Sequence, residues 1–297
     1  MLFSAVLLLS HSVLLSAKIS VTTFSLHFQI RFTDFCPFSY FSRRALFYTI
    51  YPKAGFAFMS LFVIADTHLS LNNSKPMDIF GSRWSGHVEK LRMAWSSIVG
   101  ENDTVVIAGD ISWAMTLEKA REDLAFIDSL PGKKILIRGN HDYWWSTPTR
   151  IGDFFEKNDI SSISILQNSA IKCEDFVLCG TRGWYSDEAS CKEDADFKKV
   201  AAREALRLDM SINDAKKRNL EGEIIAFTHF PIVFGDFVSE EMLSVLKKHS
   251  VKRAFFGHIH GRYSLPQRQI YSSTEFSLVS ADFLDFRPQI ILPKNQT

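Results

Sequence analysis

The sequence predicts an α/β fold, in which helices and strands alternate in layers around one core. Three short apolar runs, at 61–65, 104–108 and 134–138, are separated by two segments whose apolar residues recur at helical spacing. Continuous apolar runs of this length are typical of strands buried on both faces of a sheet. The chain has 297 residues, 46% of them hydrophobic, which is enough for one large core.

The alternation of strand and helix begins at LFVIA (61–65). The helix expected at about 84–99 carries one apolar stripe, formed by Trp84, Val88, Leu91, Trp95, Ile98 and Val99. The second strand, TVVIA (104–108), precedes a second helix marked by Leu117, Ala120, Leu124 and Ile127. Pro131 and Gly132 end that helix before the third strand, KILIR (134–138).

Beyond residue 160 the strands become shorter. SISIL (162–166) and FVLCG (176–180) are expected to pair antiparallel, because no long helix separates them. A long helix is expected at about 190–220, followed by buried strands at EIIAF (223–227) and RAFF (253–256). Strand-like patterns return near the C-terminus in IYSST, FSLVS and PQIIL. No repeat or linker follows Met59, so residues 59–297 are expected to form one domain.

Residues 1–58 differ from the rest of the chain. A signal peptide has a Lys or Arg ahead of its apolar stretch, and none precedes the apolar stretch 2–15. The stretch is also short for a membrane span, and His11 interrupts it. Residues 18–58 are rich in Phe and nearly free of acids, and they have no sustained period, so no domain is expected there. The segment is interpreted as an extension outside the domain. A start-site artefact, a cleaved or anchoring N-terminus and a functional extension remain open.

The charge and cysteine content exclude several classes of protein. The net charge is +1, which does not suit a bulk nucleic-acid or membrane-surface binder. The four cysteines, Cys36, Cys173, Cys179 and Cys191, form neither a C-x-x-C pair nor a zinc-finger spacing. Reduced thiols are therefore expected, which favours a cytoplasmic protein, or an exported or membrane-associated one if the apolar N-terminus is retained.

Five histidine- and acid-containing motifs follow the apolar runs in a fixed order. They are Asp66-Thr67-His68, Gly109-Asp110, Gly139-Asn140-His141-Asp142, His229 and Gly257-His258-Ile259-His260. Taken singly, each has an ordinary reading as a turn, a cap or a loop histidine. Because ligands collect outside the carboxyl ends of strands in layered α/β folds, the ordered set is expected to converge on one edge of the sheet.

With these motifs the chain resembles the calcineurin-like metallophosphoesterases, which show D-x-H, G-D, G-N-H-D/E, H and G-H-x-H in this order. The match covers about residues 61–261, and the segments 75–84, 109–115 and 139–145 resemble small bacterial phosphoesterases. The resemblance implies a four-layer α/β/β/α sandwich with mixed sheets. It also implies hydrolysis of a phosphomonoester or phosphodiester, in which a hydroxide bridging two metals attacks phosphorus.

The resemblance also implies the metal ligands. One divalent ion would be held by Asp66, His68, Asp110 and His260, and the other by Asp110, Asn140, His229 and His258. The shared Asp110 would offset the repulsion between two dications. Nitrogen and oxygen ligands without thiolate suit Mn, Fe or Zn and do not choose among them. His141 would face the leaving group as general acid or charge stabiliser, and Asp142 is expected to orient it.

Aromatic residues and one arginine stand just after strand ends, and they are expected either to line a substrate site or to pack in the rim and core. The candidates for substrate binding are Trp113, Tyr143, Trp144 and Arg182, with Trp145, Trp184 and Tyr185 nearby. The protein phosphatases of the family carry an acid and an arginine soon after G-D, which the segment 109–115 lacks. That departure argues against a phosphoprotein phosphatase and leaves the partner of His141 open.

Three functions compete. A metal-dependent phosphoesterase acting on a small molecule or nucleotide is favoured. A nuclease is disfavoured because no basic stretch is present. A non-catalytic metal-stabilised scaffold or binding protein is the remaining alternative, although such proteins tend to lose His141 or a ligand. The sequence does not name the substrate, the metals or the oligomeric state.

Overall fold

The computed structural model describes residues 3–9, 13–22, 25–30, 59–71, 75–184 and 195–293, with the backbone alone for the first three segments and for 195–197. The chain divides into two compact units, Met1–Phe56 and Ala57–Thr297. Tyr185, Cys36 and Cys191 lie outside the described residues. Cys173 and Cys179 are buried free thiols. No described helix is long and apolar enough to cross a bilayer.

The first unit contains an antiparallel sheet of three strands. They are β1 (Phe3–Leu9), β2 (Val13–Thr22) and β3 (Ser25–Ile30), in the order β1-β2-β3. Backbone pairing therefore includes residues 18–22 and 25–30, for which the sequence shows no sustained period. Regular pairing occurs there although apolar and polar residues do not alternate strictly, because the strands pair through backbone groups.

The second unit holds two larger sheets. The five-stranded sheet has the order β16-β4-β5-β6-β7. It is formed by β4 (Leu61–Ile64), β5 (Thr104–Ala108), β6 (Lys133–Ile137), β7 (Ile163–Ile165) and β16 (Gln289–Ile291). Strands β4 to β7 are parallel, and β16 runs antiparallel to β4 at the edge.

The six-stranded sheet has the order β14-β15-β13-β10-β9-β8. It is formed by β8 (Ala170–Cys173), β9 (Phe176–Thr181), β10 (Glu223–Thr228), β13 (Arg253–Phe256), β14 (Arg268–Tyr271) and β15 (Thr274–Leu278). Its four central strands are parallel, and both edge strands are antiparallel. A hairpin of β11 (Val233–Phe234) and β12 (Phe237–Val238) stands apart.

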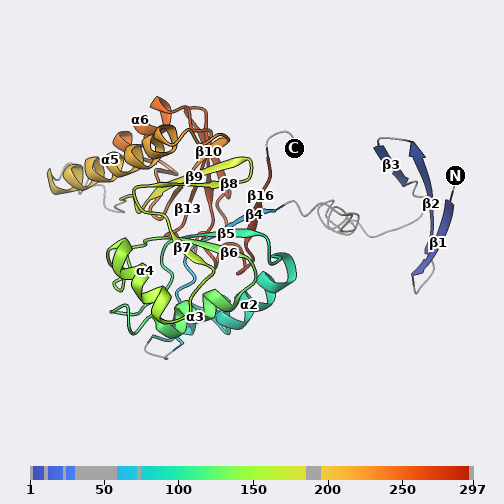
Figure 1. Cartoon of the computed structure of the whole chain (residues 1–297), viewed down its shortest axis with the longest axis horizontal. Coiled ribbons are helices and arrows are strands. Elements are labelled where there is room, and N and C mark those ends of the chain that lie inside the picture. The colour runs from blue at the N-terminus through green and yellow to red at the C-terminus, as the bar shows by residue number, and fades with distance from the viewer. Residues whose placement is uncertain are drawn as a thin grey trace. The chain divides into compact units, whose positions relative to one another are not determined.

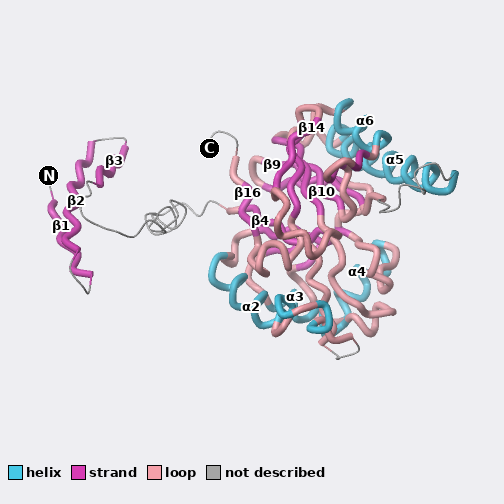
Figure 2. The backbone as a smooth tube through the Cα atoms, turned by 180° about the vertical axis from the view of Figure 1, so that it is seen from behind, coloured by secondary structure: helices cyan, strands magenta, loops and turns pink. Residues whose placement is uncertain are grey.

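Helices cover the outer face of each sheet, which gives the four-layer α/β/β/α sandwich. Helices α2 (His87–Ile98), α3 (Arg121–Ser129) and α4 (Pro148–Lys157) lie on one side of the strands, and α5 (Ala195–Lys217) and α6 (Glu240–Lys248) lie on the other (Figure 1). Figure 2 shows the same separation from behind. The short 3-10 helices η1 (Asp78–Phe80) and η2 (Ser82–Trp84) precede α2.

Side chains alternate between layers along each central strand. Phe62 and Ile64 pack toward α2, α3 and α4, whereas Leu61 and Val63 pack between the two sheets. This alternation explains why the strands read as continuous apolar runs, since both faces are buried. At the carboxyl end of β4, the Ala65 amide donates to the Val279 carbonyl at 2.8 Å, which ties the two sheets together.

One expected strand pairing is wrong. SISIL and FVLCG were expected to pair antiparallel, but β7 lies parallel to β6 in the five-stranded sheet and β9 belongs to the other sheet. The antiparallel partner of β9 is β8, which the apolar pattern did not indicate. The chain therefore crosses from one sheet to the other within the short segment between β7 and β8, where it has no helix to mark the change.

A chain that begins at Met59 is expected to fold with the melting temperature of the full chain. The first strand of the sandwich begins at Leu61, and residues Ala57–Thr297 form a compact unit. Loss of a Phe-rich segment is also expected to improve solubility. Thermal melting of the two chains in one buffer is the measurement. A melting temperature several degrees lower for the short chain would mean that the first unit stabilises the second.

Candidate metal centre

The carboxyl ends of five parallel strands bring the motifs together. One motif residue lies just beyond each strand, in the order Asp66 after β4, Asp110 after β5, Asn140 after β6, His229 after β10 and His258 after β13. His68 and His260 lie two residues further along the first and last of these segments. All seven expected ligands therefore lie at one edge of the sandwich, where its two sheets are joined.

Tight backbone turns position these side chains. Asp66, Asp110 and His258 have φ values of 58°, 52° and 70°, in the left-handed region that L residues rarely adopt. Gly109 has a φ of 93°, and a Cβ there would lie 2.6 Å from Nδ1 of His229. A Cβ at Gly139 would overlap the Asp110 backbone and carboxylate. The motif glycines are thus explained by close approach, and the strain lies at the candidate ligands.

One group of possible ligands is formed by Asp66, His68 and His260. Nε2 of His260 lies 3.5 Å from Oδ1 of Asp66 and 3.2 Å from Nε2 of His68. Nε2 of His68 lies 3.9 Å from the same Asp66 oxygen. Three potential donors of electron pairs therefore face one small volume, as the ligands of a divalent ion do.

A second group lies beside the first. Oδ2 of Asp110 is 3.4 Å from Nε2 of His229 and 3.7 Å from Nε2 of His68, so this oxygen lies between the two groups. Oδ1 of Asn140 is 2.7 Å from Nε2 of His229 and 3.1 Å from Nδ1 of His258. Asp66 is also close enough to join Asp110 and His229 in a group of possible ligands, which the sequence did not suggest.

The outer partners of two histidines leave ligand atoms facing inward. Nδ1 of His260 lies 2.8 Å from Oδ1 of Asp282, and Nδ1 of His229 lies 3.1 Å from the Ala108 carbonyl oxygen. A proton on each Nδ1 donates to that oxygen and leaves the Nε2 lone pair directed at the cluster. The imidazole lone pairs and carboxylate oxygens are all acceptors, and most of them are buried facing one another. A cation between them would stabilise this arrangement, so the residues present fit divalent metal ions.

Burial and mutual charge set the protonation of the cluster. Burial raises the pKa of the Asp66 carboxyl to about 6. Burial opposes the ionisation of Asp110, but the neighbouring His229 holds the pKa of its carboxyl well below the usual value. Although burial alone would lower it, the pKa of His229 is raised to about 9 by Asp110. In the protein alone, a protonated His229 therefore balances Asp110, and metal binding must displace that proton.

His141 lies beside both groups without belonging to either. Its backbone amide donates to Oδ1 of Asp110 at 2.8 Å, and its ring centroid lies 4.2 Å from that of Trp113 and 5.8 Å from that of His68. The Tyr143 hydroxyl is 3.4 Å from Nδ1 of His141. Burial lowers the pKa of His141. The ring is half-buried, so it is placed to meet a bound molecule.

Asp142 does not orient His141 in the structure. Its buried carboxylate accepts hydrogen bonds from the amides of Gly139 at 2.7 Å and Ile111 at 2.9 Å. The indole N–H of Trp144 donates to the same carboxylate at 2.9 Å. No hydrogen bond joins it to the His141 ring among the described residues. The carboxylate instead fixes the loops after β5 and β6 relative to each other, which corrects the expected role.

The four expected substrate residues occupy different environments. Trp113 stacks on His68 at 4.9 Å between ring centroids, and Tyr143 is 50% exposed. Trp144 is only 2% exposed and packs in the core, so it is not available to a substrate. Arg182 is half-buried after β9. Rim positions therefore belong to Trp113, Tyr143 and Arg182, and Trp144 is a core residue.

The family of the chain follows from a match to the motif-bearing region as a whole. The family described as calcineurin-like phosphoesterase matches residues 59–262. The chain belongs to the calcineurin-like phosphoesterases. The resemblance drawn from the five motifs is thereby confirmed, and the group of Asp and His residues is the candidate metal centre of a family that acts on phosphate esters.

Individual relatives of this phosphoesterase are distant or match only in part. The Gene 66 protein of Mycobacterium phage L5 is 48% identical over 56 residues, which is 19% of this chain and 27% of that protein. The match thus spans about a quarter of that relative's length. A protein of unknown function from Aquifex aeolicus is 15% identical, with 78% of this chain and 96% of that chain covered and a TM-score of 0.44.

Two further solved structures are similar to this chain. A phosphopantetheinyl hydrolase from Mycobacterium tuberculosis is 14% identical, with 80% of this chain and 97% of that chain covered and a TM-score of 0.45. A protein from Thermus thermophilus is 8% identical, with 78% and 98% covered and a TM-score of 0.48. The family assignment depends on the match over residues 59–262 and not on these structures.

Asp282 is a residue beside the candidate metal centre that none of the five motifs contains. It is fully buried and accepts from the Tyr263 hydroxyl at 2.9 Å and the Gly261 amide at 3.2 Å, besides its contact with His260. A signal was present, because Asp282 follows the apolar run FSLVS (276–280) as Asp66 follows LFVIA. That pattern of an acid soon after a buried strand identifies it without a motif.

Asp282→Asn is expected to weaken metal binding by about ten- to a hundredfold, because a carboxylate behind a ligating histidine fixes its ring and raises its basicity. Metal titration of the purified protein measures the affinity. Tyr263→Phe is the matched control, since it removes a donor to Asp282 and leaves the contact with His260 in place. Equal metal affinity in Asp282→Asn and the unaltered protein would remove Asp282 from the centre.

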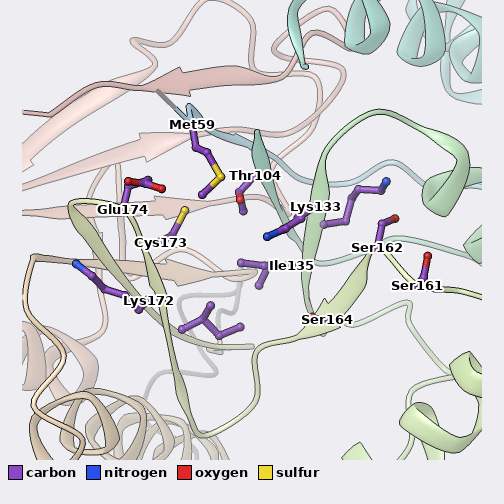
Figure 3. Close-up of a pocket in the computed structure, with 12 residues that line it drawn as sticks. Met59, Thr104, Lys133, Ile135, Ser161, Ser162, Ser164, Lys172, Cys173 and Glu174 are labelled. Carbon is purple, nitrogen blue, oxygen red and sulfur yellow. The ribbon is translucent and has the colours of Figure 1, made fainter. Parts of the chain in front are cut away.

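A cavity of about 530 Å³ lies away from the metal centre. It is lined by Thr104 and Lys133, the first residues of β5 and β6, together with Met59, Cys173 and Glu174 (Figure 3). The expected ligands instead follow the last residues of these strands. None of the residues that line this cavity belongs to the candidate metal centre.

Proposed function

We propose that the chain is a dinuclear metal-dependent phosphoesterase that hydrolyses a phosphomonoester or phosphodiester of a small molecule or nucleotide. The observation that carries this proposal is the position of Asp110. One of its carboxylate oxygens lies 3.4 Å from Nε2 of His229 and 3.7 Å from Nε2 of His68, between the two groups of possible ligands. A carboxylate in that position suits a bridge between two dications.

Each ion would take ligands from both sheets. Asp66, His68, Asp110 and His260 would hold one ion, and Asp110, Asn140, His229 and His258 would hold the other. These ligands offer only nitrogen and oxygen atoms, which suit Mn, Fe or Zn. When bound, two divalent ions lower the pKa of water enough to supply a nucleophile near neutral pH, and they offset charge on the phosphoryl oxygens.

His141 is proposed to assist the departure of the alcohol. Its backbone is fixed by the hydrogen bond to Asp110, and the Trp113 ring limits the positions of its imidazole. A half-buried imidazole beside the ligand groups can place a proton on the leaving oxygen, or stabilise the charge that develops there. The Asp142 carboxylate accepts from backbone amides, whereas the Tyr143 hydroxyl lies 3.4 Å from Nδ1 of His141 and could orient the ring.

An activity screen of the metal-reconstituted protein tests the proposal. Bis-p-nitrophenyl phosphate, p-nitrophenyl phosphate and a panel of nucleotides distinguish diesterase from monoesterase activity. Hydrolysis that requires Mn, Fe or Zn and disappears after chelation supports it, and elemental analysis of the active protein should find about two ions per chain. A protein that binds two ions and hydrolyses none of these esters would instead favour the non-catalytic alternative.

A further inference from the structure

Arg182, at the end of β9, lies within the electrostatic influence of three other arginines. Arg182 directly follows this strand, Arg138 follows β6, and Arg203 and Arg207 belong to α5. Burial lowers the pKa of the Arg182 guanidinium, Glu204 raises it, and the other three arginines lower it further, which places all of them within electrostatic reach. Among the described residues that influence the charge of Arg182, three are arginines and Glu204 is the one acid.

The acid in this group, Glu204, is already used by other partners. Its fully buried carboxylate accepts from the Thr181 hydroxyl at 2.6 Å and the Gly183 amide at 3.3 Å, the residues on either side of Arg182. Its other oxygen accepts from Arg207. Glu204 therefore holds the backbone at Arg182 in place, while no hydrogen bond joins it to the Arg182 guanidinium among the described residues.

Two neighbouring donors in this region have no acceptor within the described part of the chain. They are Nε of Arg182 and Nε1 of Trp184, and both are buried. The guanidinium carbon of Arg182 lies 5.5 Å from the centre of the Trp184 ring. Both groups can only donate, so neither can satisfy the other. Adjacent buried donors of this kind can be satisfied together by the oxygens of one bound anion.

This region adjoins the metal centre. The Arg182 carbonyl accepts from the amides of His229 at 3.1 Å and Phe230 at 2.9 Å. The Trp184 ring lies 5.6 Å from that of Phe230, which in turn lies 4.4 Å from the ring of His258. Arg138 stands two residues before Asn140 in the chain. A molecule held at the metal centre can therefore reach the arginines with another part of its structure.

We propose that Arg182, together with Arg138 and Trp184, binds a second anionic group of the substrate, so that the substrate is a phosphate ester carrying a further phosphate that is not cleaved. The planar fork of an arginine matches the oxygens of phosphate, and a second arginine nearby also favours an anion. This inference rests on the proposed function for the cleaved phosphate, but the anion-binding arginines are a separate feature of the protein.

A matched pair of nucleotides tests this proposal. Adenosine 3′,5′-bisphosphate and adenosine 5′-monophosphate are compared as substrates of the metal-reconstituted full chain. The unaltered protein is expected to prefer the bisphosphate in kcat/KM. Arg182→Gln is expected to reduce that preference by about tenfold or more, as loss of a charge-assisted hydrogen bond predicts. Arg182→Lys, which keeps the charge without the fork, should retain part of the preference.

Binding measured without turnover supplies an independent readout. Calorimetric titration of the chelator-treated full chain with adenosine 3′,5′-bisphosphate should show binding that Arg182→Gln weakens by about tenfold or more. Arg92→Gln is the matched control, because Arg92 is an exposed arginine on α2 that pairs with Glu89. This control is expected to leave both the nucleotide preference and the binding unchanged.

The outcomes separate the two proposals. If Arg182→Gln changes neither the nucleotide preference nor the binding, the buried donors are satisfied by water alone and the second subsite is overturned, while the phosphoesterase proposal stands. If no phosphate ester is hydrolysed but bisphosphate binding still depends on Arg182, the phosphoesterase proposal fails and the anion subsite stands. An equal loss for both nucleotides also overturns the subsite for a second phosphate.

Discussion

Asp110→Ala is expected to abolish phosphoester hydrolysis and to lower bound metal more than the loss of any other single candidate ligand. The Asp110 carboxylate lies within 3.7 Å of imidazole nitrogens from both groups, so its removal deprives each ion of a ligand. It also removes the negative charge that offsets repulsion between two dications. In the proposed arrangement each of the other ligands holds one ion, so that their loss should leave the second ion partly held.

Elemental analysis and turnover of the purified variant decide this prediction. Asp153→Ala is the matched control, because Asp153 is an exposed acid on α4. Asp110→Asn is a useful second variant, since it keeps the size of the side chain and one oxygen while it removes the charge. A folded Asp110→Ala protein that retains about two ions and normal turnover would rule out the bridging role.

His141→Ala is expected to retain both ions and to lose roughly a hundredfold or more in kcat, the range expected for a removed general acid. The ring lies beside both groups without being a ligand, so metal content should not depend on it. The loss should be smaller for p-nitrophenyl esters than for alkyl esters, because a good leaving group needs less protonation. Single-turnover rates on both ester types, with metal content measured in parallel, are the readout.

Two other results would limit the role of His141. Equal losses on p-nitrophenyl and alkyl esters would exclude proton transfer and leave stabilisation of charge. A loss of metal would make His141 part of the cluster. Tyr143→Phe tests whether the Tyr143 hydroxyl contributes to the role of His141. This variant removes the hydroxyl that lies 3.4 Å from Nδ1 of His141 and keeps the aromatic ring of residue 143.

The strands that carry the centre could be predicted closely from the sequence. β4, β5, β6, β10 and β13 fall almost entirely within the apolar runs because both faces of these strands are buried. The same burial makes the motifs easy to recognise in the sequence, because each polar motif directly follows a continuous apolar strand. Convergence of seven residues at one edge then follows from the parallel arrangement of the strands.

Features that depend on contacts between distant segments could not be predicted in this way. The change of sheet between β7 and β9 is decided by which strand each one meets, and a short apolar run does not encode its neighbour. Trp144 and Tyr143 are adjacent aromatic residues in different environments. Trp144 is buried and donates a hydrogen bond to Asp142, whereas Tyr143 is exposed. Only the orientation of the loop after β6 distinguishes them.

The hydrogen bond between the His258 amide and the Asp66 carboxylate has a consequence for how the protein is made. These residues are separated by 192 positions, so a growing chain contains Asp66 long before it contains His258. The proposed ligand set exists only after β13 and the loop that follows it, as far as His260, have been synthesised and placed. Metal that binds this native arrangement alone adds to the free energy of unfolding. If the proposed ligands hold two ions, a fragment that ends before His258 lacks part of the set, and binding of both ions is expected only once both sheets have formed around β13.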